Sequence, residues 1–286
     1  MINVWVTGSK GQLGQEIKNN LNKGNSNFLF TKRNDIDITK KEDIERFIRL
    51  NKIKVIINCA AYTNVDDAEK NTELAFAVNS DGVLKLVQCC EKFNSKLIHI
   101  STDFIFDSNK NIPIKENKTP NPFCAYAKSK YQGEQYILNS SIDSIIIRSS
   151  WIYSEFGNNF LKNIMKISKK KKSISVVNDQ IGSPTYANDL AMVCILFVKR
   201  YITITGQNIF NYSNLGECSW YDFAIEIKKN AKLNCNINPI KTEDFHSLAK
   251  RPKYSVLDKS KIKRELGIEI PFWKDSLKIC INKIIK

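Results

Sequence analysis

Tyr126 and Lys130 are the residues whose types and spacing are best suited to chemistry. Residues four apart share one face of a helix, so the phenol and the ammonium would point the same way. A tyrosine normally keeps its proton up to a pKa of about 10, and a neighbouring lysine cation favours the phenolate and lowers that pKa. The pair is therefore predicted to donate or accept a proton at neutral pH, as the interconversion of a carbonyl and an alcohol requires.

A short polar segment, Ser101-Thr102-Asp103, precedes this pair and directly follows the apolar run Leu97–Ile100. We interpret that run as a strand, which places Thr102 just past the carboxyl end of the strand. Ligands bind at this edge in open α/β sheets. The Thr102 hydroxyl would hydrogen-bond a substrate oxygen there and polarise a ketone.

Three glycines near the N-terminus, Gly8, Gly11 and Gly14, follow the apolar run Val4–Val6 and open a helix. In this context the first glycine allows a sharp turn, the second lets the backbone approach a pyrophosphate, and the third lets the helix pack closely. The N-terminus of that helix offers amide donors and the positive end of a dipole. The pattern predicts a dinucleotide site that could supply a hydride.

The segment after the second predicted strand bears on the choice of nicotinamide cofactor. An acidic residue there would bind the ribose hydroxyls and repel a 2′-phosphate, but this chain has Lys32 and Arg33 instead. Two cations favour NADPH, with Arg33 or Lys32 on the 2′-phosphate. The alternative is that both are ordinary exposed bases, and NADH stays possible. Asp37 and Ile38 follow closely and could contact the adenine.

Strand and helix patterns alternate through residues 1–150, which predicts an α/β fold with a Rossmann-type, doubly wound parallel sheet. Residues 151–286 are less regular and are predicted to form mainly a smaller substrate-binding lobe, with some segments returning to the sheet. The predicted strands are Val4–Val6, Phe28–Phe30, Val55–Ile57, Leu97–Ile100, Ile145–Ile147, Ile174–Val177 and Asn208–Asn211. The predicted helices are Gln12–Leu21, Glu42–Leu50, Glu73–Phe93, one carrying Tyr126 and Lys130, Asn159–Lys169, Leu190–Lys199, Trp220–Lys229 and Phe272–Lys283.

Composition describes an ordinary globular protein of 286 residues with a net charge of +15. Its lysines are scattered, and the one dense run, Lys169–Lys172, follows a predicted helix, so we expect no nucleic-acid partner. There is no long apolar run and no secretory signal, which favours a cytoplasmic protein without a membrane partner. Eight cysteines without zinc-site spacing are expected to be reduced thiols.

Two histidines are present, and neither is expected to be catalytic. His99 lies within an apolar strand, where packing is the simpler interpretation. His246 lies in a polar segment with no visible partner. The sequence also lacks a Gly-x-Ser-x-Gly elbow, which argues against a hydrolase with a Ser-His-Asp triad.

The motifs together resemble a known family. The glycine loop, Thr102 and Tyr126-x-x-x-Lys130 resemble the extended short-chain dehydrogenase/reductase superfamily. Longer segments narrow this resemblance to the dTDP-4-dehydrorhamnose reductase family: Gly11-Gln-Leu-Gly14, Asn58-Cys-Ala-Ala-Tyr-Thr63, Ser101-Thr-Asp103, Arg148-Ser-Ser-Trp151-Ile-Tyr153, Asn158-Asn-Phe160, Asn178-Asp-Gln-x-Gly182-x-Pro-Thr185 and Arg251-Pro252.

The resemblance implies an oxidoreductase of dTDP-rhamnose and polysaccharide biosynthesis, in which NAD(P)H reduces the C4 ketone of a dTDP-linked 4-keto-6-deoxy sugar to dTDP-L-rhamnose. Tyr126 would protonate the alkoxide, Lys130 would also hold the nicotinamide ribose, and Thr102 would bind the ketone. The cofactor-binding residues implied are Gly8, Gly11, Gln12, Leu13, Gly14, Lys32, Arg33, Asp37, Ile38, Ala61, Tyr62, Thr63, Tyr126 and Lys130. The substrate-binding residues implied are Thr102, Asp103, Trp151, Asn178, Gln180 and Arg251.

The chain departs from this family at two positions. Phe104 stands where many members carry a tyrosine, so a substrate contact is lost. Some relatives bridge a dimer through a metal held by glutamates, but the corresponding position here is Asn188, so no metal is expected. A homodimer stays possible.

Two other functions are compatible with the same scaffold. A sugar-nucleotide epimerase or dehydratase would keep its cofactor through the cycle, but such enzymes commonly carry a glutamate after the Ser/Thr, which Thr102-Asp103-Phe104 lacks. A non-catalytic NADP-binding regulatory subunit would have no use for the proton donor Tyr126. The residues leave the C4 configuration of the product open.

Overall fold

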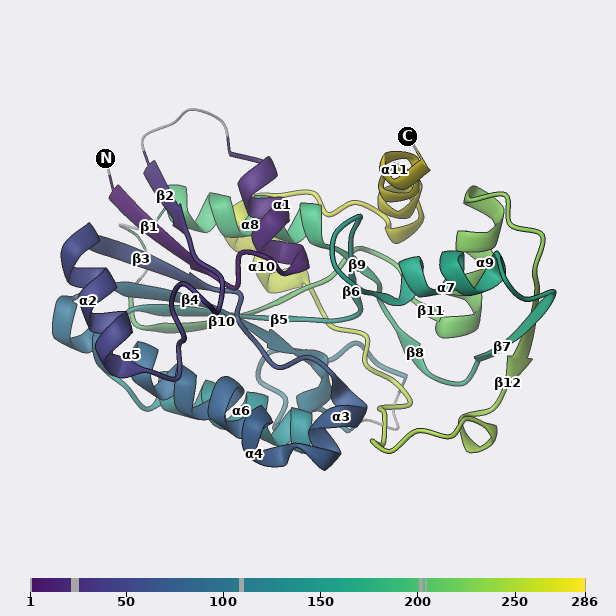
Figure 1. Ribbon diagram of the computed structural model, residues 1–286, viewed down its shortest axis with the longest axis horizontal. Helices are drawn as coiled ribbons and strands as arrows, with labels where there is room; N and C mark the ends of the chain where they lie inside the picture. The colour runs from purple at the N-terminus through teal and green to yellow at the C-terminus, as the bar shows by residue number, and fades with distance from the viewer. Residues whose placement is uncertain (1, 22–25, 108–110, 201–202, 204, 286) are drawn as a thin grey trace.

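The computed structural model describes residues 2–21, 26–107, 111–200, 203 and 205–285. At its centre is a six-stranded sheet in the order β10-β5-β4-β3-β1-β2 (Figure 1). All neighbouring strands in it run parallel, which confirms the predicted doubly wound parallel sheet. The strands are β1 (Ile2–Thr7), β2 (Ser26–Phe30), β3 (Ile53–Asn58), β4 (Lys96–Thr102), β5 (Ser144–Ser149) and β10 (Gln207–Tyr212).

Helices cover both faces of this sheet, as its apolar strands require. One face carries α1 (Gln12–Asn19), α8 (Ala187–Lys199) and α10 (Ser260–Leu266). The opposite face carries α2 (Lys41–Asn51), α5 (Gly82–Phe93) and α6 (Ala125–Leu138), and Figure 1 shows the sheet between these two layers. Strand β5 is buried along its whole length, as a central strand covered on both sides should be.

The single helix predicted for Glu73–Phe93 is interrupted. After α3 (Val65–Lys70), the chain forms α4 (Thr72–Phe76), a π-helical turn η1 (Ala77–Asp81) and then α5. The wide turn brings the Asn79 carbonyl against α6 at Gly133, where an added Cβ would lie only 2.3 Å from that oxygen. The Tyr62 backbone amide donates to Asn79 Oδ1 at 2.8 Å, and Asn79 Nδ2 donates to the Tyr62 carbonyl at 3.0 Å. The π turn therefore fixes the loop after β3, a function often associated with such turns.

The second half of the chain supplies both a smaller lobe and parts of the sheet layer. Strand β10 pairs with β5, and α8 packs against α1, so segments after residue 151 do return to the sheet. The boundary predicted at residue 150 stays a prediction. The lobe contains α7 (Phe160–Ser168), α9 (Trp220–Asn230), α11 (Trp273–Ile285), and the strand pairs β7 (Ser173–Val177) with β12 (Asn236–Ile240), β6 (Ile152–Tyr153) with β9 (Thr185–Tyr186), and β8 (Ile181–Gly182) with β11 (Cys218–Ser219).

Two general expectations can be compared with the described part of the chain. Within it, no helix is both long enough and apolar enough to cross a membrane. All eight cysteines are free thiols, and seven of them are buried.

A buried ion pair joins α6, which carries Tyr126 and Lys130, to the sheet. Arg148 of β5 and Glu134 of α6 are 2% and 0% exposed, and Arg148 Nη2 lies 2.7 Å from Glu134 Oε2. Arg148 Nε donates to the same carboxylate at 3.1 Å, and Nη1 donates to the Glu116 carbonyl at 2.9 Å. Because the Arg148 guanidinium has acceptors on both Glu134 and Glu116, the ion pair fixes the position of α6 on the sheet.

Glu134→Gln should therefore lower the free energy of unfolding by about 3–5 kcal/mol, because it leaves a buried guanidinium without its counter-charge. Urea denaturation would measure the loss. Glu42→Gln, an exposed position on α2, should change stability by less than about 0.5 kcal/mol. Equal small effects of both substitutions would contradict the importance assigned to the pair.

Candidate active site

Two adjoining cavities open at the carboxyl ends of the strands. The larger has a volume of about 630 Å³ and the smaller about 280 Å³. Both are lined by Gly11, Cys59, Ala60 and Ala61, so they form one continuous crevice. It lies where β1 has β2 on one side and β3 on the other, which is the point where ligands bind in doubly wound sheets.

The glycine loop forms the floor where the cavities meet. Gly8 adopts a left-handed φ of +62°, and an added Cβ would lie 2.7 Å from the Ala60 nitrogen, so only glycine fits. At Gly14 an added Cβ would lie 2.7 Å from Ser9 Cα, as expected for the glycine that packs helix against loop. Helix α1 begins at Gln12 without a hydrogen bond from a capping side chain and without an acidic residue in its first turn. Its first amides are therefore free to bind an anion.

The smaller cavity brings together the residues predicted at the adenosine end. Lys32, Arg33, Asp37, Ile38 and Tyr62 all line it. Arg33 Nε lies 3.5 Å from Asp37 Oδ2 with the Arg33 side chain 66% exposed, so the guanidinium can turn to a phosphate. Burial would raise the pKa of Asp37, but hydrogen bonds to Thr39 and the charge of Arg33 lower it below its ordinary value.

The larger cavity brings together the residues predicted for catalysis. Thr102 and Asp103 come from the end of β4, and Tyr126 and Lys130 come from α6. The other predicted residues in its lining are Gly11, Gln12, Leu13, Ala61, Thr63, Trp151 and Arg251. Residues from six separate segments of the chain therefore converge on one space of a size suited to a small-molecule ligand.

The electrostatics of Tyr126 differ from the expectation. Burial raises the pKa of Tyr126 to about 12, and a hydrogen bond with Thr102 opposes this only in part. Lys130 Nζ instead donates to the Ile100 carbonyl at 2.6 Å and lies 3.2 Å from His99 Nε2. The prediction that Lys130 lowers the pKa of Tyr126 is therefore wrong for the chain by itself, because the lysine bonds β4 rather than the phenol.

Asp103 is a buried acid beside these groups. Asp103 is 1% exposed. Burial raises the pKa of its carboxyl to about 7, although hydrogen bonds from neighbouring groups oppose the rise. Thr102 Oγ1 lies 3.3 Å from Asp103 Oδ1. The carboxyl thus exchanges its proton near neutral pH next to the hydroxyl that is expected to bind the substrate oxygen.

Trp151 forms the wall on the side of the smaller lobe. It has a φ of +47°, an uncommon conformation for a tryptophan, and its ring stacks on Trp220 with centroids 3.5 Å apart. An added Cβ at Gly182 would lie 2.6 Å from the Trp151 ring, which explains the glycine there. Trp220 also lines the cavity and was not predicted as a site residue. The sequence predicts the helix that Trp220 opens, and Ser219-x-x-Asp222 is its capping box, but neither shows which way the helix faces.

Three predicted substrate-binding residues remain to be placed. Arg251 lines the larger cavity and is paired with Asp66, at 2.6 Å between Nη2 and Oδ2. Asn178 and Gln180 lie outside the lining of both cavities. The Gln180 amide donates to Thr242 Oγ1 at 3.1 Å, and the Asn178 backbone donates to the Ile240 carbonyl. The structure therefore does not bring these two residues to the crevice.

Comparison with known proteins gives the family. The model of the RmlD substrate binding domain family matches residues 2–285. The chain belongs to this family. It is 39% identical to a dTDP-4-dehydrorhamnose reductase of Aggregatibacter actinomycetemcomitans, over 97% of this chain and 98% of that protein.

Solved structures of the family share the whole fold. A dTDP-4-dehydrorhamnose reductase from Clostridium acetobutylicum has a TM-score of 0.94 at 36% identity, with complete coverage of both chains. One from Bacillus anthracis, solved in complex with NADP, has a TM-score of 0.91 at 35% identity, over 99% of both chains. The resemblance inferred from the motifs is thereby confirmed.

Phe104, where the chain departs from the family pattern, makes an aromatic contact with Tyr126. The Phe104 ring lines the larger cavity and meets the Tyr126 ring edge-on, with centroids 5.7 Å apart and planes at 81°. Such a contact favours a fixed ring orientation. Phe104 therefore supports the orientation of the Tyr126 ring while offering no hydroxyl to a ligand.

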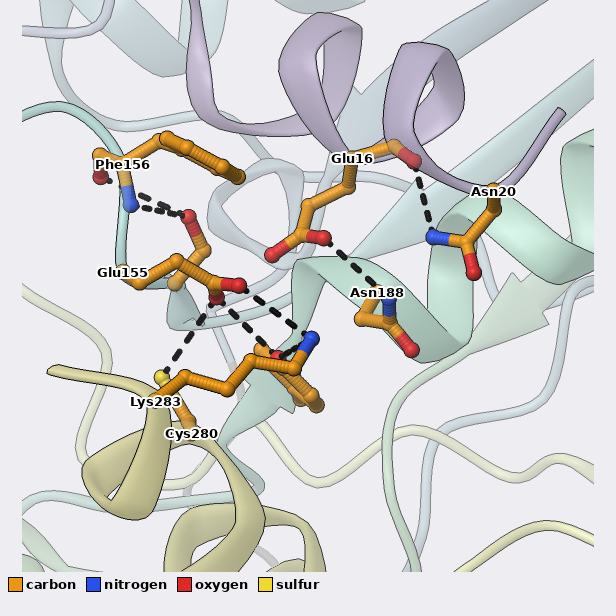
Figure 2. Close-up of polar contacts among 9 residues, drawn as sticks. Glu16, Asn20, Glu155, Phe156, Asn188, Cys280 and Lys283 are labelled. Atoms are coloured by element: carbon orange, nitrogen blue, oxygen red, sulfur yellow. Dashed lines mark hydrogen bonds and ion pairs between the residues drawn. The ribbon is translucent and has the colours of Figure 1, made fainter. Parts of the chain in front are cut away.

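The departure at Asn188 lies in a cluster of polar side chains that surrounds the buried Glu16 and links the two halves of the chain. Figure 2 shows the Glu16 carboxyl, from α1, directed toward Glu155 and Lys283. Asn188 Nδ2 donates to Glu16 Oε2 at 3.1 Å, and Lys283 Nζ lies 3.2 Å from Glu155 Oε1. Within the described ranges, no group of three or more His, Cys, Asp or Glu residues is arranged to hold a metal ion. The absence of a metal stays a prediction.

The two carboxyl groups of this cluster, Glu16 and Glu155, differ in their pKa. Burial, together with the neighbouring Glu155, raises the pKa of Glu16 from its ordinary value of 4.5 to about 8. For Glu155, burial would raise the pKa, but the hydrogen bond with Glu16 and the charge of Lys283 lower it. Glu16 therefore keeps its proton at neutral pH, while Glu155 is ionised.

This proton gives stability a pH dependence. The stability contributed by neutral Glu16 is fully present below its unfolded pKa near 4.5 and is lost as pH rises through about 8. Glu16→Gln keeps the neutral shape, so its melting temperature should exceed that of the unsubstituted protein at pH 9 but differ little at pH 5. Differential scanning calorimetry at both pH values would measure this, with Glu42→Gln as the control. A constant difference at both pH values would contradict it.

Proposed function

We propose that this protein reduces the C4 ketone of dTDP-4-dehydrorhamnose to dTDP-L-rhamnose with NADPH. The observation that carries the proposal is the convergence of Thr102, Tyr126 and Lys130 on a crevice continuous with the glycine loop. The relatives named above, which align along nearly their whole length, are dTDP-4-dehydrorhamnose reductases. A pure binding subunit would not need a phenol placed beside a ketone-binding hydroxyl.

The crevice fits a nicotinamide dinucleotide phosphate. Open first-turn amides of α1 suit its pyrophosphate, and Lys32 and Arg33 line the cavity at the adenosine end. A family structure that is 35% identical to this chain holds NADP. When bound, this group supplies the hydride.

The chain's own residues supply the proton and hold the sugar. The Thr102 hydroxyl would bind the ketone oxygen and stabilise the negative charge that develops on it. Tyr126, with its pKa raised to about 12 by burial, enters the reaction as a phenol and gives its proton to the alkoxide. The stacked pair Trp151 and Trp220 offers an apolar wall to the deoxysugar, and Arg251 offers a cation to the diphosphate.

Four further expectations belong to this proposal. Residues 151–286 would supply most of the substrate-binding lobe, and the enzyme would act in the cytoplasm. It would be active as a monomer or a homodimer. Phe104 lacks the hydroxyl of a tyrosine, so it would weaken binding of the sugar while Tyr126 is kept as the proton donor.

The activity can be measured directly. The protein should consume NADPH when given enzymatically generated dTDP-4-dehydrorhamnose, followed by absorbance, and the product should be dTDP-L-rhamnose by NMR. Tyr126→Phe should lower kcat by about 10²–10⁴-fold while NADPH still binds. Tyr136→Phe on the same helix should leave kcat unchanged. No turnover by the unsubstituted protein would overturn the proposal.

The cofactor preference depends on the cations of the smaller cavity. Arg33→Ala should raise the KM for NADPH about tenfold and leave the KM for NADH nearly unchanged, because only NADPH carries the 2′-phosphate. Steady-state kinetics with each cofactor would measure this. Arg46→Ala, an exposed arginine on α2, should change neither value. Equal effects of Arg33→Ala on both cofactors would remove Arg33 from the phosphate site.

A further inference from the structure

Helix α3 lies at the rim of the larger cavity, and its first residue, Val65, lines that cavity. Two acidic side chains of this helix bond other segments of the chain. Glu69 Oε1 accepts a hydrogen bond from the Ala125 amide at the start of α6, at 2.7 Å, and Asp66 bonds the segment 249–251. Because α3 is held against α6 in this way, the Asp66 carboxylate is a fixed anchor for that segment.

The Asp66 carboxylate binds the end of the Arg251 guanidinium. Arg251 Nη2 donates to Asp66 Oδ2 at 2.6 Å, and Nη1 donates to Oδ1 at 3.2 Å. Nη1 also donates to the Ala249 carbonyl at 3.0 Å, and the Ala249 amide donates to Asp66 Oδ1 at 3.0 Å. Burial would raise the pKa of Asp66, but hydrogen bonds from Arg251 and Ala249 and the charge of Arg251 lower it. The carboxylate is therefore ionised at neutral pH.

These contacts leave one edge of the Arg251 guanidinium free. A guanidinium carries five N–H groups in a rigid plane. Both hydrogens on Nη1 and one on Nη2 have acceptors, which leaves Nε–H and the second hydrogen on Nη2. These two N–H groups are parallel and match two oxygens of a phosphoryl group. In the part of the chain that the structure describes, no protein acceptor meets this edge.

The free edge belongs to a side chain that lines the larger cavity and is 20% exposed. Asp66 and Ala249 hold the other donors, so the edge from Nε to Nη2 is the part of the guanidinium left for a ligand. An unrestrained arginine loses side-chain entropy when a ligand fixes it, and this loss weakens binding. Here Asp66 fixes Arg251 before any ligand arrives.

We propose that Asp66 is a positioning residue, which holds Arg251 so that its Nε–Nη2 edge binds a phosphoryl group of a nucleoside diphosphate through two parallel hydrogen bonds. The inference deepens the reduction proposed above and rests on it for the class of substrate. Asp66 itself does not touch the ligand. Recognition of the diphosphate is thereby assigned to a pair of residues from opposite ends of the chain.

The charge of Asp66 also acts against an anion. A carboxylate near a phosphate weakens its binding by repulsion, but the Asp66 side chain is 38% exposed, so water and salt screen its charge. The carboxylate also occupies a different edge of the guanidinium from the one offered to the ligand. Orientation of Arg251 is therefore expected to outweigh the repulsion.

Binding of dTDP tests the proposal without turnover. Isothermal titration calorimetry on the full chain should show that Asp66→Ala weakens dTDP binding about tenfold and leaves NADPH binding unchanged. Asp107→Asn is the matched control, because Asp107 bonds Lys250 of the same segment at 2.9 Å without touching Arg251. It should leave the affinity for dTDP unchanged. Equal weakening by both substitutions, or tighter binding in Asp66→Ala, would overturn the proposal.

A second variant separates the two contacts of Asp66. Asp66→Asn keeps an oxygen for the Ala249 amide but loses the charge and one acceptor for Arg251. It should therefore weaken dTDP binding nearly as much as Asp66→Ala does. An affinity equal to that of the unsubstituted protein would show that Asp66 only holds the backbone, and would contradict the proposal.

A double-mutant cycle shows whether Asp66 acts through Arg251. Arg251→Ala alone and Arg251→Ala combined with Asp66→Ala should bind dTDP equally weakly, whereas additive losses would overturn the proposal. In turnover, Asp66→Ala should raise the KM for the sugar nucleotide about tenfold and leave kcat unchanged, while a merely structural defect would lower kcat. Failure of the unsubstituted protein to turn over would overturn the reduction alone. Its failure to bind dTDP at millimolar concentration would overturn this inference.

Discussion

The close approach of the glycine loop to the backbone after β3 is the constraint on which the rest of the site depends. Gly8 lies so near Ala60 that no side chain fits between them. The same approach places the Thr7 hydroxyl against the Cys59 and Ala60 amides. It thereby opens the crevice at the sheet edge on one side, and on the other it lets the buried Thr7 hydroxyl donate to Asn58 Oδ1 at 2.7 Å. A single packing requirement thus shapes the crevice and also fixes the polar side chains beside it.

The smaller lobe completes the crevice through a second close approach. Trp151 leaves β5 with a left-handed backbone, and its ring fits only because Gly182 has no side chain. The Asn159 amide then reaches across to the Gln12 side chain at 2.8 Å, so the lobe also bonds the first helix. These contacts explain how a lobe built from short strand pairs can present a defined wall to a ligand.

The sequence predicted the parts of the site that follow from local rules. Alternating strands and helices fix the parallel sheet, and residues after strand ends, such as Thr102 and Ala61, must meet at its carboxyl edge. The pKa of Tyr126 was not predictable, because it depends on burial and on where Lys130 finds its acceptor. Trp220, Glu16 and Glu155 were not predictable either, since their partners come from segments distant in the chain. Asn178 and Gln180 were predicted to bind substrate only because they match a motif of the family. Their hydrogen bonds to Ile240 and Thr242 hold them outside the crevice.

The position of β10 in the sheet has a consequence for how the chain is made. Strand β5 ends at Ser149, yet its outer neighbour β10 begins only at Gln207. During synthesis the apolar run Ile145–Ile147 is complete long before the strand that covers its edge leaves the ribosome. An uncovered apolar edge is a template for pairing with other chains. The nascent protein therefore exposes an unpaired edge of β5 after α6 has formed and until β10 pairs with it.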